Sequence, residues 1–360
     1  MARQYPGRIS AVAAIAAFLT GCSHDVKPRL AGPFPKKLSA WRLFAGRAPE
    51  LKPNRGVVPY DLNTTLFTDY ATKRRFVWMP PGRAAVYNPN ETFEFPKGTI
   101  LVKTFSYPDV ALGGRERLIE TRLLVNTKEG WFALPYVWNQ AQTDAVLDMN
   151  ADPVDVLWKD RGGAVHKIQY VIPNANQCRE CHDQNKVTGP IGPKARHLNR
   201  DLDYPGGRLN ELAYWTKIGY LTGAPDPVRA PRQPVWDEPA TGSIEARARA
   251  YLDVNCAHCH SPGGAASNTG LYLSDLETDQ VRLGFCKTPV ATGKASADML
   301  FDTVRGHPET SILVHRMASD EPKIMMPEIG RTITHQEGVE LIRQWIASLN
   351  GMCQSSRPSI

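Results

Sequence analysis

Short stretches of β-branched and aromatic residues dominate the chain between residues 64 and 173. They are separated by turn signals such as Pro-Gly, Asn-Pro-Asn and Gly-Gly, and several alternate between apolar and polar positions. A period of two between turn residues is typical of short, half-buried β-strands. The pattern predicts an all-β domain, a sandwich or a partly open barrel of about seven to nine strands. The clearest runs are 74–79, 92–95, 99–107, 117–126, 131–138 and 166–172.

Three later segments carry apolar side chains at the spacing of an α-helix. Residues 209–221 and 243–255 show this spacing, and so do residues 334–349. The last run begins with Thr334-His335-Gln336-Glu337, which has the form of a capping box. The fold class that we expect is a multidomain α+β protein, in which an N-terminal all-β domain of sandwich or barrel type is followed by mainly α-helical domains.

The composition is that of a globular protein with more than one domain. The 360 residues exceed the usual size of a single domain. Values of 42% hydrophobic and 22% charged residues exclude a wholly disordered chain, a collagen and a polytopic membrane protein. The net charge of +7 is spread along the chain without a block of like charges. Nucleic acid is therefore not an expected partner.

The start of the chain resembles the export signal of a bacterial lipoprotein. Arg3 and Arg8 precede an apolar stretch at 9–20 that is too short to remain as a membrane-spanning helix. The stretch ends in Leu19-Thr20-Gly21-Cys22, which resembles a lipobox. This resemblance implies cleavage before Cys22 and acylation of its thiol, which would anchor the protein to a membrane. Ser23 favours the outer membrane, and the alternative is a buried amphiphilic helix that contains Cys22 by chance.

Two CxxCH motifs are the strongest chemical signal in the chain. They are Cys178-Arg179-Glu180-Cys181-His182 and Cys256-Ala257-His258-Cys259-His260. Two thiols at this spacing can each add to a vinyl group of haem, and the histidine that follows is the proximal ligand of the iron. The motifs therefore predict two covalently bound haem c groups, attached through Cys178, Cys181, Cys256 and Cys259, with His182 and His260 as iron ligands.

Two other uses of CxxC pairs fit this spacing less well. The cysteine pairs of a zinc site are usually much closer in sequence than residues 181 and 256 are here. A thioredoxin-like redox pair normally lies in a βαβ pattern, which is not evident in this chain. Neither alternative requires a histidine directly after the second cysteine.

The second motif lies in the sequence context of a cytochrome. Residues 243–352 contain, in order, a predicted helix, CxxCH, loops, a Met-Pro loop and a C-terminal helix, and they resemble a class I cytochrome c domain. The resemblance implies that a methionine of the loop is the sixth ligand of the iron. Met326, directly before Pro327, fits best. Met325 is the alternative ligand, and packing in the core is the alternative role for both methionines.

The ligand set of the first motif is incomplete. No methionine occurs between Met149 and Met299, so a local methionine ligand is not available. His197 is the nearby imidazole and the candidate sixth ligand, which would give a bis-His haem of lower potential. The alternatives are His166, Met149 or Met79 as ligand, an open sixth site, or a role for His197 as an ordinary surface residue.

Two of the seven cysteines remain after these assignments, namely Cys286 and Cys353. In an oxidising compartment we expect them to form a disulfide. Two separate buried thiols are the alternative.

Taken together, the lipobox, the β-rich front half and the two CxxCH motifs resemble a family of dihaem c-type cytochrome lipoproteins from Gram-negative bacteria. The resemblance implies a lipid-anchored periplasmic protein that transfers electrons between redox partners that the sequence does not identify. The alternative is an enzyme, a dihaem peroxidase or oxidase with an open site at the first haem. The expected organisation is a signal peptide at 1–21, a lead-in segment at 22–63, the β-rich domain at 64–173, a first haem-binding segment at 174–240 and the class I cytochrome c-like domain at 241–353.

Overall fold

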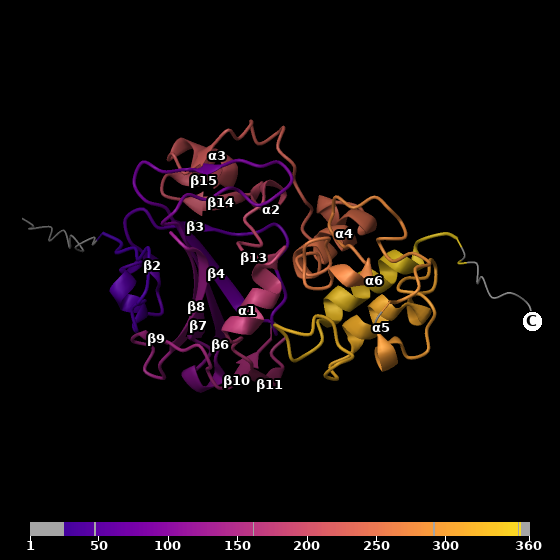
Figure 1. The fold of residues 1–360 in the computed structure, drawn as a ribbon. Helices are drawn as coiled ribbons and strands as arrows, with labels where there is room; N and C mark the ends of the chain where they lie inside the picture. Colours follow the sequence, from indigo (N-terminus) through magenta and orange to yellow (C-terminus); the bar gives the residue numbers. More distant parts are fainter. Residues whose placement is uncertain (1–24, 47, 161, 291, 352, 354–360) are drawn as a thin grey trace, which may run out of the picture.

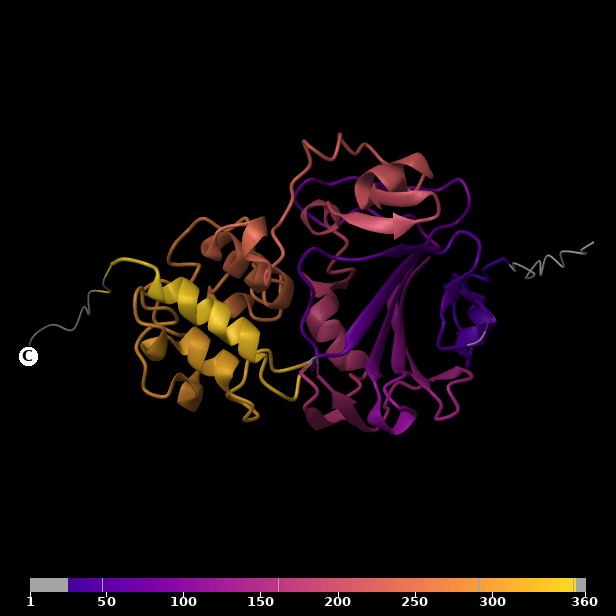
Figure 2. The same ribbon diagram turned by 180° about the vertical axis from the view of Figure 1, so that it is seen from behind.

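The computed structural model describes residues 25–353, apart from residues 47, 161, 291 and 352. The expected signal peptide and the lipidation site Cys22 lie outside the described residues, so both stay predictions. Figure 1 and Figure 2 show two lobes side by side. The larger lobe surrounds a β-sheet, and the smaller lobe contains α4 (Ile244–Asn255), α5 (Ile312–Ala318) and α6 (Gln336–Ala347).

The larger lobe is built on one antiparallel sheet of six strands. In spatial order they are β3 (Val58–Tyr60), β4 (Thr72–Trp78), β6 (Ile100–Pro108), β7 (Glu116–Thr127), β8 (Gly130–Trp138) and β9 (Ala145–Leu147). The strands from β6 to β9 follow one another in sequence, as expected where short turns join antiparallel neighbours. Side chains alternate between the two faces of the sheet, and each face has its own hydrophobic core.

The two faces of the sheet are covered by different parts of the chain. Ile100 on one face shares a core with Trp41 of the 3-10 helix η1 (Leu38–Trp41). The Trp41 indole also donates to the Tyr136 hydroxyl at 2.7 Å. Leu101 on the opposite face shares a core with Trp215 of α3 (Glu211–Lys217), and α2 (Ala195–Leu198) contributes to the same core.

Pairs of short strands surround the sheet. In the described part of the chain these are β1 (Phe44–Ala45) with β2 (Lys52–Pro53), β10 (Val154–Lys159) with β11 (Val165–Tyr170), β12 (Asp183–Gln184) with β13 (Val187–Thr188), β14 (Asp201–Tyr204) with β15 (Gly207–Asn210), and β16 (Leu221–Thr222) with β5 (Ala85–Val86). A short 3-10 helix, η2 (Val110–Leu112), joins β6 to β7. α1 (Ala175–His182) lies between the sheet and the smaller lobe (Figures 1 and 2).

One hydrophobic core holds the smaller lobe together. Leu252 of α4, Val314 of α5 and Ile342 of α6 belong to it. Gly338 lets α6 approach α4, because a Cβ atom at this position would collide with the Tyr251 hydroxyl. Around these helices the described residues form turns and the 3-10 helices η3 (Pro239–Thr241), η4 (Ser267–Thr269), η5 (Gly293–Ser296) and η6 (Pro308–Thr310).

The expected fold class is wrong in both halves. The front half is a single six-stranded sheet with small strand pairs, and the segments that carry the CxxCH motifs are not mainly α-helical. Of the described residues, only 22% are in helices and 26% are in strands. Four of the six α-helices in this part of the chain have eight residues or fewer. Proline and glycine recur between residues 183 and 240 and again between 261 and 330, and both residues interrupt helices.

Two local expectations also fail. Thr334 does not cap α6: its Oγ1 donates to the backbone oxygen of Ala318 at 3.2 Å, and no side chain caps the helix at His335. Residues 92–95 do not form a strand, because Thr92 bridges to Lys194 while Glu94 bridges to Val86. Among the described residues, no helix combines the length and the apolar character that would be needed to span a bilayer.

Candidate functional site

The two CxxCH motifs are far apart in sequence but lie against each other in the structure. Gln184, which follows the first motif, donates from Nε2 to the backbone oxygen of His258 at 2.6 Å. The Asn185 amide donates to the backbone oxygen of Gly263 at 2.8 Å. The sulfur atoms of Cys181 and Cys259 and a ring nitrogen of His258 all lie within 4.8 Å of one another. The two motifs therefore form one site where the lobes meet.

A cavity of about 690 Å³ opens at this junction. Its volume is within the range of pockets that bind cofactor-sized ligands, roughly 300–1,000 Å³. Residues of both motifs line it, together with the Met-Pro loop: Cys178, Cys181, His182, Cys256, His258 and Met326. Of the described residues in the second motif, Cys259 and His260 do not line this cavity.

Two helices position the first cysteine of each motif. α1 begins with a capping box in which Asn174 accepts from the Gln177 amide and the Gln177 side chain accepts from the Asn174 amide, both at 3.0 Å. Cys178 and Cys181 are three residues apart and share one face of this helix. Cys256 is the C-cap of α4. Burial raises the pKa of the Cys178 thiol, and it raises the pKa of the Cys256 thiol to about 12.

The histidine of each motif is oriented by a backbone carbonyl group. Nδ1 of His182 lies 2.8 Å from the backbone oxygen of Gly189, and Nδ1 of His260 lies 3.3 Å from that of Leu271. This geometry places the proton on Nδ1 and leaves Nε2 as the free lone pair. Burial lowers the pKa of both imidazoles to about 4, so both rings are neutral at pH 7. A neutral imidazole with a free Nε2 is the form that binds a metal.

Arg331 holds the Met-Pro loop against the cavity. Its guanidinium donates to the backbone oxygen of Met326 at 2.9 and 3.2 Å and to that of Ser319 at 2.7 Å. The Met326 amide donates to the backbone oxygen of Arg316 at 2.9 Å. Met326 lines the cavity, whereas Met325 is not among the described residues that do so. This placement favours Met326 over Met325 as the ligand, and the assignment stays a prediction.

His197 lines the cavity, but its ring is already engaged. Nε2 lies 2.9 Å from Oδ2 of Asp253, a residue of α4. Arg196 donates to the same carboxylate from Nε and Nη2, both at 2.9 Å, and Gln233 donates to it at 2.9 Å. Burial lowers the pKa of His197, so the imidazole is neutral and Arg196 balances the charge of Asp253. The structure therefore gives no support to His197 as an iron ligand through Nε2.

The other candidates for the first sixth ligand are placed elsewhere. Nε2 of His166 lies 2.7 Å from Oδ2 of Asp160. Met79 is buried in the core on one face of the sheet. None of the three residues His166, Met149 and Met79 is among the described residues that line the cavity.

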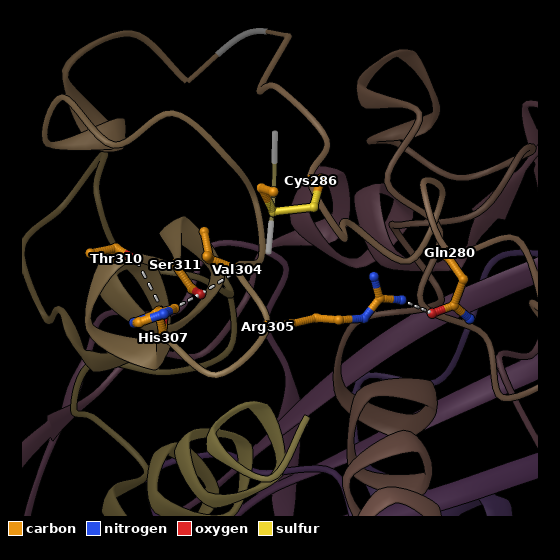
Figure 3. Close-up of a disulfide and its surroundings, with 8 residues drawn as sticks. Gln280, Cys286, Val304, Arg305, His307, Thr310 and Ser311 are labelled. Carbon is orange, nitrogen blue, oxygen red and sulfur yellow. Dashed lines mark hydrogen bonds between the residues drawn. A yellow bond between two sulfur atoms is a disulfide. The ribbon is translucent and has the colours of Figure 1, made fainter. Parts of the chain in front are cut away.

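The remaining cysteines lie together at the edge of the smaller lobe. The sulfur atoms of Cys286 and Cys353 are 2.09 Å apart, and 67 positions separate the two residues in sequence. Figure 3 shows this disulfide near a hydrogen bond of 2.6 Å from Arg305 to Gln280. The disulfide ties the loop that contains Cys286 to the segment that follows α6.

Sequence reasoning missed three features of the site. His258 lies inside the spacer of the second motif, and its buried Nδ1 has no hydrogen-bond partner among the described residues. The Asp253 carboxylate accepts hydrogen bonds from Arg196 at 2.9 Å and from the Asp275 amide of the smaller lobe at 3.2 Å, and Lys103 lines the cavity. The available signals were a second histidine within CxxCH and a single lysine within the apolar run at 99–107.

Comparisons with protein-family models, with curated proteins and with solved structures find no match to this chain. The residues and contacts of the site are therefore the basis on which a function can be proposed.

Proposed function

We propose that this chain is an exported, lipid-anchored cytochrome that binds two haem c groups covalently and transfers electrons one at a time. The observation that carries the proposal is the pair of CxxCH motifs at one junction, each with its histidine fixed through Nδ1 by a backbone carbonyl group. Haem attached through such a motif supplies reversible one-electron exchange between Fe(III) and Fe(II).

The residues of the site fit this cofactor. Four thiols at CxxC spacing are available for thioether bonds, and His182 and His260 present neutral imidazoles. Met326 lines the cavity and supplies a thioether sulfur, which favours Fe(II) and raises the potential. Gly264 keeps the backbone of the second motif compact, since a Cβ atom there would collide with the backbone oxygen of Cys259.

The packing of the motifs against each other suits an electron relay. The hydrogen bonds from Gln184 to His258 and from Asn185 to Gly263 hold the two motifs in a fixed relative position. Two one-electron centres fixed side by side in one protein can exchange electrons without a docking step.

A zinc site is the rival use of these side chains. Cys181, Cys259 and His258 are close enough to share one ion, and three protein ligands are typical of zinc sites with an open position. This use would leave Cys178, Cys256 and both oriented imidazoles without a role. Haem attachment uses all of them.

The second candidate function is a peroxidase or oxidase. It is favoured by the environment of His197. Nε2 of this residue is hydrogen-bonded to Asp253 and would not bind the iron of the first haem, which would leave the sixth coordination position open. An open position there would bind cyanide rapidly, and the protein would oxidise a reduced donor with peroxide.

Counting the haem groups tests the proposal. Mass spectrometry of the mature protein should give the polypeptide plus two haem groups, and acid–acetone should extract neither. Replacing Cys178 and Cys181 with alanine should remove one haem, and replacing Cys256 and Cys259 should remove the other. Replacing Cys286 and Cys353 with serine is the matched control and should leave both. A protein that contains zinc and no covalent haem would overturn the proposal.

A further inference from the structure

One wall of the cavity carries a row of cationic side chains. Arg75 on β4 is opposite Lys103 on β6, and Lys103 is opposite Arg122 on β7. All three line the cavity that the first CxxCH motif also lines. Like charges directly opposite each other on neighbouring strands are destabilising. A row of three in a partly buried wall therefore calls for a compensating anion.

The acidic neighbours do not fully compensate this row. Arg122 pairs with Glu120 at 2.5 Å, and Nη1 of Arg75 pairs with Asp61 at 2.5 Å. Lys103 forms no ion pair with any described residue, and its Nζ lies 5.0 Å from the centre of the Phe105 ring.

The second terminal nitrogen of the Arg75 guanidinium also lacks a hydrogen-bond acceptor. The Arg75 side chain is only 4% exposed. Its Nη2 is buried and has no hydrogen-bond acceptor within the described part of the chain. A buried charged donor without an acceptor is strongly unfavourable. Burial and the charges of Arg75 and Arg122 lower the pKa of Lys103 well below its ordinary value. The wall therefore offers a free guanidinium edge, and beside it a lysine that an anion in the cavity would hold in its charged form.

The row lies close to the first motif. Lys103 and Arg122 line the same cavity as Cys178 and His182. A group that fills this cavity would therefore contact both the row and the first motif.

We propose that Arg75, Lys103 and Arg122 form a binding site for an oxyanion, such as a carboxylate, beside the first CxxCH motif. Guanidinium and ammonium groups in a partly buried wall bind carboxylates through short, charge-assisted hydrogen bonds. The proposal rests on the proposed function, because the propionates of an attached haem are one source of such carboxylates. A small soluble oxyanion is the other source.

The test uses the holoprotein after its two haem groups have been counted by mass. Lys103→Met removes one charge, and Lys103→Arg keeps it. Lys128→Met is the control, since Lys128 is exposed in the turn between β7 and β8 and is not among the described residues that line the cavity. Lys103→Met should lower the midpoint potential of the first haem, because a lost positive charge favours Fe(III). Lys103→Arg should restore the potential, and Lys128→Met should shift it much less.

Two further measurements identify the source of the anion. A change of the propionate vibrations in the resonance Raman spectrum of Lys103→Met, without added anions, assigns the site to haem propionate. A saturable spectral change on adding formate or nitrite to the wild type, lost in Lys103→Met, assigns it to a soluble oxyanion. Equal potential shifts in Lys103→Met and Lys128→Met, with no difference in either measurement, would overturn the site. A chain without covalent haem would instead overturn the proposed function, and the haem count separates the two failures.

Discussion

The two lobes hold their CxxCH motifs in different ways. In the larger lobe, the first motif lies on α1, and its cysteines are outside the hydrophobic cores that cover the sheet. In the smaller lobe, Cys256 packs against the one core that joins α4, α5 and α6. The larger lobe can therefore keep its core without its motif, whereas the second motif is part of the packing of its own lobe.

The electrostatic surroundings differ as well. The first motif meets a wall that contains Lys103 and Arg122, while the second is followed by a loop that carries Met326. Charge and ligand type near a metal centre tune its potential. If both motifs carry haem as proposed, the two haem groups are therefore expected to differ in potential because of the lobes that surround them.

The largest effect on this two-lobe arrangement is expected at Asp253. It accepts hydrogen bonds from Arg196 and Gln233 outside the smaller lobe while belonging to α4. Asp253→Asn leaves Arg196 buried without its counter-charge, which costs about 3–5 kcal/mol. Urea unfolding followed by tryptophan fluorescence measures the loss. Asp203→Asn is the control, because its ion pair with Arg208 is largely exposed, and similar unfolding midpoints for both variants would contradict the prediction.

The same residue predicts an acid dependence. Burial would raise the pKa of Asp253, but the hydrogen bonds from His197 and Arg196 outweigh it and hold the pKa well below its ordinary value of 3.8. A depressed carboxyl pKa stabilises the folded state above that value, and this stabilisation is lost as the pH falls below it. The destabilisation of Asp253→Asn relative to the wild type should therefore shrink in acid.

The disulfide lies in the smaller lobe alone, so its removal tests whether the two lobes unfold independently. Replacing Cys286 and Cys353 with serine opens a loop of 67 residues. The loop-entropy relation for that length gives ~4 kcal/mol, and measured losses are typically about 2–4 kcal/mol. Hydrogen exchange should show faster opening of α5 and α6 and unchanged protection of β6 and β7. Faster exchange in the sheet would show that the lobes unfold as one unit.

Met326→Ala should have the smallest effect on stability, because this residue is only partly buried. Loss of the soft sulfur should lower the potential of the second haem and remove the weak red-edge absorption typical of methionine-ligated ferric haem c. Redox titration and the ferric absorption spectrum measure these changes, and Met325→Ala is the matched control. If Met325→Ala removes the band and Met326→Ala does not, the ligand is one residue earlier.

Local sequence patterns predicted parts of the fold and missed its assembly. The runs of β-branched and aromatic residues at 99–107 and 117–126 correspond to β6 and β7, and the helical spacing at 243–255 corresponds to α4. These elements follow from the composition and spacing of their own residues. The same patterns do not determine whether a sheet is covered by a second sheet or by loops and short helices. The expected fold class was wrong because it assumed a second sheet or a barrel in the front half.

The candidate site divides in the same way. The residues proposed to bind haem lie in two contiguous motifs, so Cys178, His182, Cys256 and His260 can be named from the sequence. Their mutual contact depends on residues that are distant in the chain, such as Gln184 and His258. The partner of His197 could not be predicted either, because Asp253 belongs to a helix whose docking is set by tertiary packing.

The approach of Cys181 to Cys259 bears on how the protein is made. In the folded chain the hydrogen bond with Cys259 lowers the pKa of Cys181, which favours the reactive thiolate. In an oxidising compartment two such neighbours can join as a disulfide. That bond would take one cysteine from each motif, and neither motif could then form both of its thioethers. If both motifs carry haem, the haem groups have to be attached before the lobes close on each other. A chain that folds before attachment could no longer bind both haem groups covalently.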